Sequence, residues 1–184
     1  TTTDLAEDFN GEIAFLDSSG RLLANTGNDS FWGWVSQNAQ SLSLASPSDR
    51  EPVFSTPILD PNSKRLFVIV SAYSASRDVI VAGAFSPETL AAETLSTTYP
   101  TGSHVTIYLL DESRRLLFVS GALAQDRLES DHPGVTEALQ GQSGVLYVKK
   151  DKTEHVVAYS PIESTGWALI TEEEWEMVVS PSLQ

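Results

Sequence analysis

The chain of 184 residues carries 25 acidic and 11 basic side chains, and its net charge of −14 argues against nucleic acid or an anionic membrane surface as a partner. Hydrophobic residues make up 41% of the chain, with 4 Trp, 5 Tyr and 7 Phe, which is enough for a packed core and excludes a disordered chain. The absence of cysteine excludes disulfides, thiolate nucleophiles and zinc–thiolate sites.

The first half of the chain predicts a hairpin, a helix, three more strands and a second helix. The expected strands are residues 12–16, 21–25, 53–59, 65–73 and 78–85. Residues 17–20 form the hairpin turn, because Asp and Ser side chains bond to turn amides and Gly accepts a positive φ. Helices are expected at residues 31–40 and from Pro87 to about residue 97, the second beginning with Ser86 as its cap.

The second half predicts the same plan with shorter connections. Its expected strands are residues 104–110, 115–120, 144–149, 154–161 and 166–171. A short helix is expected at residues 133–140, where Gly141 ends it. The order in each half is a hairpin, a helical segment and three antiparallel strands, which is the order of PAS-like folds.

A repeated sequence supports this division. The pattern Leu-Asp-x-Ser-x-Arg-Leu-Leu-x-x-x-Gly occurs at residues 16–27 and again, 94 residues later, at residues 110–121. A long period that occurs only twice indicates a tandem domain. We therefore expect an α+β fold of two tandem PAS-like lobes, residues 1–100 and 101–184, each an antiparallel sheet of about five strands with flanking helices.

In this order of elements the chain resembles, over nearly its whole length, the Cache class of extracytoplasmic PAS-like sensor domains in its double form. The segments that carry the resemblance are residues 15–23, 55–60, 82–90, 132–141 and 159–167. The resemblance implies a sensing module held between two transmembrane helices, with a membrane-distal first lobe and a membrane-proximal second lobe. The output would be a histidine kinase above all, or a chemoreceptor or nucleotide cyclase. The family usually begins with a long helix that spans both lobes, of which almost none precedes Gly11 here, so residues 1–10 are expected to be the tail of a helix.

The amino-acid-binding pattern of that family is absent from this chain. Residues 31–34 lie where the helix aromatics would be, but no Arg precedes them. Ile58 stands where a Tyr would precede Asp60, and Ala84 stands where a closing Asp would be. A ligand with α-amino and α-carboxylate groups is therefore not supported, and the class of the small-molecule ligand stays open.

The candidate ligand-binding residues are Trp32, Trp34, Ser71 and Tyr73. Trp32 and Trp34 form an aromatic cluster with Phe31, and aromatic walls with a few polar groups are typical of small-molecule pockets. Ser71 and Tyr73 share one face of a strand through its period of two, and both bring hydroxyls. The alternatives are ordinary core packing for the aromatic rings and contact with water for the hydroxyls.

Polar residues of the second half give no metal or catalytic pattern. The three histidines lack short ligand spacing, and residues 131–133 are interpreted as a helix start. The acidic run 172–174 before Trp175 is interpreted as a solvated connection rather than a calcium site. No serine-hydrolase elbow, phosphate loop or zinc-protease motif occurs, and no cofactor is expected.

We therefore expect a non-enzymatic sensor domain whose first lobe binds a small molecule. It would be the extracellular or periplasmic portion of a cell-membrane protein, attached through helices outside this sequence and able to form a homodimer. The longest apolar run, residues 79–85, is too short to cross a bilayer. Two alternatives stay open: a ligand-free structural or adhesive module, and a hydrolase that uses a pair of carboxylates.

Overall fold

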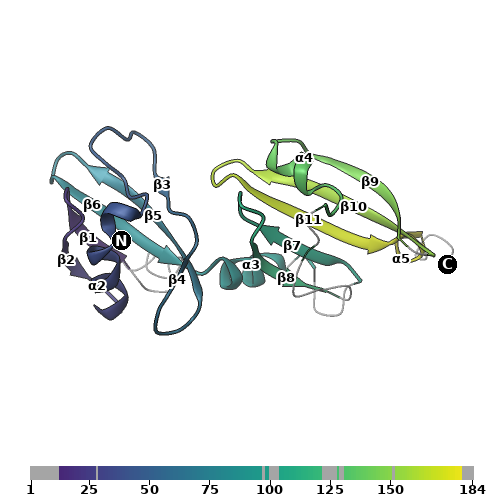
Figure 1. The fold of residues 1–184 in the computed structure, drawn as a ribbon, viewed down its shortest axis with the longest axis horizontal. Coiled ribbons are helices and arrows are strands. Elements are labelled where there is room, and N and C mark those ends of the chain that lie inside the picture. Colours follow the sequence, from purple (N-terminus) through teal and green to yellow (C-terminus); the bar gives the residue numbers. More distant parts are fainter. Residues whose placement is uncertain are drawn as a thin grey trace. The chain divides into compact units, whose positions relative to one another are not determined.

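The computed structural model of the chain describes residues 13–27, 29–96, 98–99, 104–121, 128, 131–150 and 152–179. The chain divides into two compact units, a first lobe (Thr1–Leu90) and a second lobe (Ala91–Gln184), and the division falls within helix α3 (Pro87–Ser96). Each lobe is built on one antiparallel sheet with short helices (Figure 1), which confirms the predicted α+β fold of tandem PAS-like lobes. The assignment of residues 1–100 as membrane-distal and 101–184 as membrane-proximal stays a prediction, and the expected N-terminal helix lies outside the described residues.

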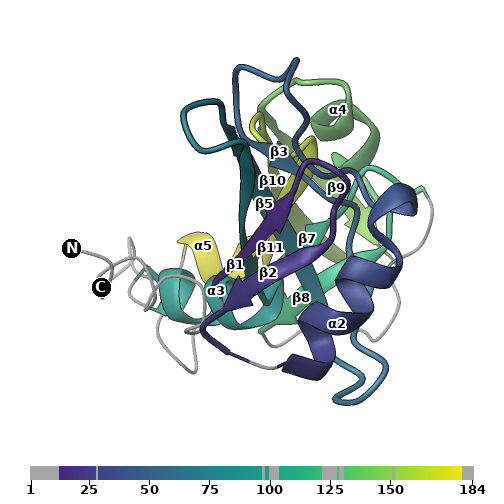
Figure 2. The ribbon, with the colours of Figure 1, turned by 90° about the vertical axis from the view of Figure 1, so that its left-hand side faces the viewer.

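The first lobe contains a six-stranded sheet in the order β2-β1-β6-β5-β3, with β4 paired separately to β5. Its elements are β1 (Ile13–Asp17), β2 (Leu22–Asn25), α2 (Asp29–Gln37), the 3-10 helix Ala39–Ser41, β3 (Val53–Phe54), β4 (Ile58–Leu59), β5 (Leu66–Ser74) and β6 (Val79–Phe85). Helix α2 runs along β2 (Figure 2) and buries its apolar side against the sheet.

The core of the first lobe lies between α2 and the sheet. Its fully buried large side chains include Trp32 and Phe31, whose rings meet edge to face with centroids 5.3 Å apart. The buried cluster consists of Ala14, Leu16, Phe31, Trp32, Val35, Ala45, Ile58, Ile69, Ile80, Ala82 and Ala84. Because side chains alternate between the two faces of a strand, every other residue of β5 faces this core and α2.

The predicted strand at residues 53–59 is wrong as one element, because β3 and β4 are separated by residues 55–57. Ser55 lies in this gap, and its hydroxyl accepts a hydrogen bond of 2.9 Å from the Ile69 amide. Pro57 follows, and proline has no N–H to give to a ladder. The hydroxyl of Ser55 thus replaces a backbone carbonyl as acceptor, its own N–H still donates to the Ile69 carbonyl at 2.8 Å, and residues 55–57 belong to no strand.

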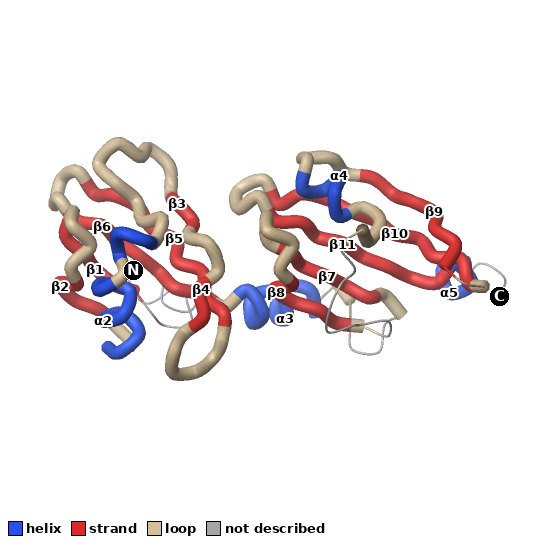
Figure 3. Tube along the Cα trace, in the orientation of Figure 1, coloured by secondary structure: helices blue, strands red, loops and turns tan. Residues whose placement is uncertain are grey.

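The second lobe contains a five-stranded sheet in the order β8-β7-β11-β10-β9 (Figure 3). Its elements are β7 (Thr106–Leu110), β8 (Leu116–Ser120), α4 (Val135–Leu139), β9 (Gly144–Lys150), β10 (Thr153–Ile162), β11 (Trp167–Glu174) and α5 (Trp175–Val179). Helix α4 packs against β10 and β11. The buried cluster beneath it consists of Tyr108, Leu110, Val135, Ala138, Val157, Ala168 and Ile170.

Strand β11 is longer than expected, and the interpretation of residues 172–174 as a solvated connection is wrong. These residues continue the strand, and Glu172 is only 6% exposed. Ala168, Ile170 and Glu172 alternate along one face of β11, so the carboxylate enters the same core as the two apolar side chains. The helix predicted at residues 133–140 is shorter than expected, because Gly134 is its N-cap and α4 begins only at Val135. His132, which precedes this helix, is buried.

An aspartate closes the hairpin turn that opens the first lobe. Oδ1 of Asp17 accepts the backbone N–H groups of Ser19 and Arg21 at 3.0 Å each, and the Ser19 hydroxyl at 2.6 Å. Arg21 also pairs with Oδ2 at 3.1 Å. These bonds, the Ser19 hydroxyl foremost, lower the pKa of Asp17 to about 2.

The second lobe opens with the same turn. Oδ1 of Asp111 accepts the backbone N–H groups of Ser113 at 2.9 Å and Arg115 at 2.8 Å. The left-handed position of the turn is Gly20 in the first copy, with φ 86°, and Arg114 in the second, with φ 62°. Arg114 accepts that strained conformation and donates a hydrogen bond of 2.9 Å to the Thr136 hydroxyl in α4.

We predict that Gly20→Ala destabilises the chain whereas Gly33→Ala stabilises it. A Cβ at residue 20 would lie 2.3 Å from the Cβ of Ala39, and the left-handed backbone adds roughly 1–2 kcal/mol of strain. A Cβ at residue 33 in α2 meets nothing within 4 Å, so alanine there gains up to about 1 kcal/mol of helix propensity. Urea unfolding measures both free energies, and shifts of the same sign would contradict the assigned backbone of the turn.

We predict that Asp17 contributes to acid sensitivity. Its folded pKa of about 2 lies below the ordinary 3.8, so the carboxylate stabilises the folded chain fully above pH 3.8 and loses that effect as the pH falls towards 2. Asp17→Asn keeps the oxygen acceptor and removes the charge. The difference in unfolding temperature between wild type and variant should shrink as the pH falls through this range, and a constant difference would contradict the prediction.

Candidate functional site

The four residues expected at a ligand site lie on two elements that face each other in the first lobe. Trp32 and Trp34 belong to α2, and Ser71 and Tyr73 belong to β5. Trp32 is part of the buried core, and Trp34 and Tyr73 pack against that core from its edge. We call this region, with Ser71, the α2-face site. Whether it binds a ligand stays a prediction at this point.

Trp32 holds the one feature of the α2-face site that core packing leaves unexplained. The side chain is 0% exposed, yet its indole Nε1–H has no hydrogen-bond partner among the described residues. A buried donor without a partner costs about 1–3 kcal/mol. The indole ring fills the core and contacts Phe31, so core packing accounts for the burial of the ring. It does not account for the burial of the Nε1–H donor without a partner.

Ser71 is already used by the backbone around it. Its hydroxyl accepts the N–H of Ala45 at 2.9 Å and lies 3.4 Å from the carbonyl of Val53, to which it donates. Ala45 packs into the core together with Leu42 and Leu44. Ser71 therefore holds the segment 42–53 over the α2 face of the sheet, rather than presenting a free hydroxyl.

Tyr73 is also engaged locally. Its hydroxyl donates a hydrogen bond of 2.5 Å to Oδ1 of Asp78, at the turn between β5 and β6, and this bond raises the pKa of Tyr73. Asp78 itself has a left-handed backbone with φ 54°. The pair closes the hairpin, so Tyr73 supplies its ring to the edge of the α2-face site while its hydroxyl points to the turn.

Trp34 is half-buried, because it lies beside the buried face of α2 that Phe31, Trp32 and Val35 form. The carbonyl of Trp34 accepts both the backbone N–H of Asn38 at 3.1 Å and its side-chain amide at 2.8 Å, which ends α2. The N-terminal end of α2 is tied down as well, because Asn62 donates a hydrogen bond of 3.1 Å to the Ser30 hydroxyl. Both ends of the helix that carries the two tryptophans are therefore held.

The opposite face of the first sheet carries a shallow apolar hollow of ≈ 210 Å³. Its lining residues are Ile13, Pro52, Val70, Ser71, Ala72, Val81, Ala82 and Gly83. With a single hydroxyl residue in its lining, the hollow offers little to orient a polar ligand. The unpartnered donor of Trp32 lies in the core on the α2 side, so the α2-face site remains the stronger candidate in this lobe.

Sequence reasoning missed a polar group in the second lobe. His132, His155 and Glu172 are buried together there, although they are far apart along the chain. In the sequence, the acidic run 172–174 and the three histidines were interpreted as separate features. The described residues contain no group of three or more His, Cys, Asp or Glu arranged to hold a metal ion.

Within the described ranges, no helix combines the length and the apolar character that a membrane span requires. Comparison of the sequence with protein-family models gives no match. No curated protein matches the sequence either.

Solved structures do match the fold. The extracellular domain of rpHK1S-Z16, a protein named as a histidine kinase, superposes with a TM-score of 0.63 at 18% identity, over 96% of this chain and 76% of that one. The ligand-binding domain of the Pseudomonas fluorescens chemoreceptor CtaA with L-alanine gives 0.56 at 16% identity, over 95% and 76%. The sensory domain of the Campylobacter jejuni chemoreceptor Tlp3 with isoleucine gives 0.58 at 10% identity, over 91% and 67%.

At these identities the likeness establishes the fold, and it agrees with the order of elements seen in the sequence. The matches cover both lobes, since they extend over at least nine-tenths of this chain. The chain has the tandem PAS-like fold of these extracellular and ligand-binding domains.

Proposed function

We propose that this chain is the extracytoplasmic ligand-sensing domain of a transmembrane receptor of the histidine kinase or chemoreceptor type. It binds a small molecule at the α2-face site of the first lobe and relays binding across the membrane. The similar structures support this proposal: one is an extracellular domain of a protein named as a histidine kinase, and others hold L-alanine, isoleucine or asparagine.

The observation that carries the proposal is the unpartnered Nε1–H of Trp32. A ligand oxygen or nitrogen that accepts this hydrogen bond would recover the cost of burying the donor. The side chains of this core, which include Phe31 and Ile69, are apolar, as is typical of the walls of small-molecule sites. The site thus selects a ligand with one acceptor directed at α2 and an apolar or neutral remainder.

Access to Trp32 requires movement, because the side chain is fully buried. The segment 42–53 covers the core, and its bond from the Ala45 amide to the Ser71 hydroxyl is one of the contacts that hold it down. A ligand that binds the open form better than the closed form shifts the balance between the two. The relay would begin with this shift, since the same segment leads directly into β3 of the sheet.

The chemical class of the ligand differs, in this proposal, from that of the chemoreceptor neighbours. The residues that the family uses to hold an amino acid are replaced here by Ile58 and Ala84, neither of which can bond to an ammonium group. We therefore expect L-alanine, L-isoleucine and L-asparagine to bind weakly or not at all. A net charge of −14 also disfavours anionic ligands during their approach.

We predict that one class of neutral metabolite stabilises the chain against heat. Sugars, polyols, nucleosides and amides are tested one by one, and the three amino acids serve as compounds that are expected to bind weakly or not at all. A ligand at about a hundred times its dissociation constant should add roughly 2.7 kcal/mol to the folded state. A flat screen with folded protein would overturn the sensor proposal in favour of a ligand-free structural module.

We predict that Trp32→Phe weakens binding of the first compound found by about tenfold, because one hydrogen bond worth about 1.4 kcal/mol is lost. Trp34→Phe is the matched control, since it removes the same atoms from the same helix at its half-buried position. Calorimetric titration gives both dissociation constants. Equal losses would contradict the hydrogen bond from the Trp32 indole to the ligand, and no loss at either tryptophan would place the ligand outside the α2-face site.

A further inference from the structure

The second lobe buries a carboxylate between two imidazoles. Oε2 of Glu172 lies 3.2 Å from Nε2 of His132, and Oε1 lies 2.9 Å from Nδ1 of His155. All three side chains are 7% exposed. Charges buried this deeply depend on their partners, so the protonation state of the group affects how the lobe packs. The two imidazoles contact different oxygens, and their donors do not converge on one point as metal ligands would.

His132 is the hydrogen-bond partner of the carboxylate. Its Nδ1 lies 3.0 Å from the carbonyl of Pro133, and its Nε2 lies 3.2 Å from Oε2 of Glu172, so both ring nitrogens face acceptors. This bond lowers the pKa of Glu172 from its ordinary 4.5 despite burial. Burial, followed by the charge of Glu172, raises the pKa of Tyr108 to about 12. Glu172 is therefore a carboxylate at neutral pH.

His155 has one ring nitrogen in use and one without a hydrogen bond. Nε2 lies 3.0 Å from the hydroxyl of Thr153, which donates its own hydrogen to the carbonyl of Lys150 at 3.1 Å. Because the Thr153 hydrogen is directed at Lys150, we assign the hydrogen of the neutral His155 ring to Nε2. Nδ1 is buried and close to Glu172, but the contact is not aligned as a hydrogen bond. In the neutral ring, a lone pair on Nδ1 faces a carboxylate oxygen.

We propose that the second lobe is a proton-responsive input, in which Nδ1 of His155 takes up a proton on acidification and the imidazolium turns to bond to Glu172. Imidazole is the side chain that changes charge between about pH 5 and 8. The proton converts a repulsion between lone pairs into a charge-assisted hydrogen bond, which is shorter and stronger than a neutral one. This input is independent of the ligand proposed for the first lobe.

The groups around His155 set the balance of this proton uptake. Glu172 and Glu174 from β11 favour the charged ring, Glu174 as the residue paired with His155 across the two strands, whereas His132 ahead of α4 and Lys150 from β9 bring positive charge that opposes it. Tyr108 from β7 lies 5.5 Å from the ring of His132, measured between centroids, and stays neutral. One negative charge between two imidazoles can neutralise only one of them, so the second proton is the one that responds to pH.

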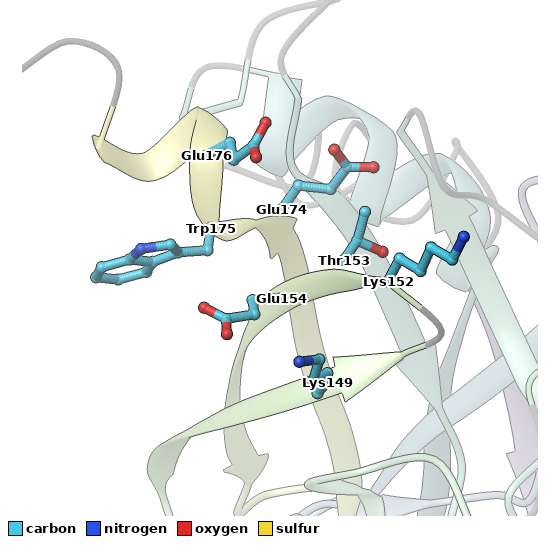
Figure 4. A pocket seen from close by; sticks show the side chains of 7 residues that line it. All are labelled: Lys149, Lys152, Thr153, Glu154, Glu174, Trp175 and Glu176. Atoms are coloured by element: carbon cyan, nitrogen blue, oxygen red, sulfur yellow. The ribbon is translucent and has the colours of Figure 1, made fainter.

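The contact from His155 to Thr153 connects the buried group to the surface. Thr153 lines a hollow of ≈ 160 Å³ together with Lys149, Lys152, Glu154, Glu174, Trp175 and Glu176 (Figure 4). Trp175 begins α5, which packs against β10 and β11, and its ring meets Tyr147 at 5.5 Å. When His155 turns towards Glu172, its hydrogen bond to Thr153 changes, and Thr153 at the start of β10 shifts beside α5.

The test is a titration of the chain between about pH 5 and 8, followed by NMR of the histidine rings and of backbone amides. We expect the amides of Thr153 and Trp175 to shift with the same midpoint as the His155 ring. The exposed His104 is the internal reference. Thr153→Val should leave the His155 ring titrating while the Trp175 amide no longer follows, because valine cannot bond to Nε2.

Two further variants keep the test decisive. Glu172→Gln should move the His155 titration to lower pH, because the charge that favours the imidazolium is gone. His155→Gln should abolish the response of the Trp175 amide. If this variant of a buried residue does not fold, Thr153→Val tests the same connection at an exposed residue. The proposal is overturned if the His155 ring does not titrate in this range, or if the Trp175 amide responds equally in Thr153→Val.

Discussion

Both lobes depend on one interaction, in which a carboxylate oxygen accepts two backbone N–H groups within a turn. Asp17 and Asp111 make it at the start of each lobe. The strands that lead into these turns, β1 and β7, lie inside their sheets, with the hairpin partner on one side and β6 or β11 on the other. The register that the turn fixes is therefore passed to the rest of each sheet. The core-facing residues of the sheets, on which α2 and α4 pack, follow from that register.

The fold could be predicted because its signals are local. The turn at Asp17 needs only residues within four positions of it, and the same residues recur at Asp111. The errors arose where distant residues decide. The strand is interrupted at Ser55 because its hydroxyl takes the Ile69 amide in place of a backbone carbonyl, and Glu172 is buried because two histidines from other segments reach it. Neither contact leaves a trace in the pattern of neighbouring residues.

The candidate site was predictable in its placement and not in its chemistry. The sequence placed two tryptophans on a helix and two hydroxyls on a strand, and the structure brings these elements together in one lobe. It also shows both hydroxyls bonded locally, Ser71 to the segment 42–53 and Tyr73 to Asp78. Which polar atom stays unpaired depends on every neighbour within about 3.5 Å, and that information exists only in three dimensions.

The exchange of Gly20 for Arg114 at the left-handed position gives the two hairpins different degrees of autonomy. In the first, glycine adopts the conformation without strain, so the turn can close from its own residues. In the second, arginine bears the strain, and its bond to Thr136 ties the turn to α4. We expect the first hairpin to form early as the chain folds and the second to wait until α4 has docked, an order that pulsed hydrogen exchange at the two turns would reveal. Two turns with nearly the same sequence thus differ in folding: the first hairpin forms from its own residues, and the second depends on its contact with α4.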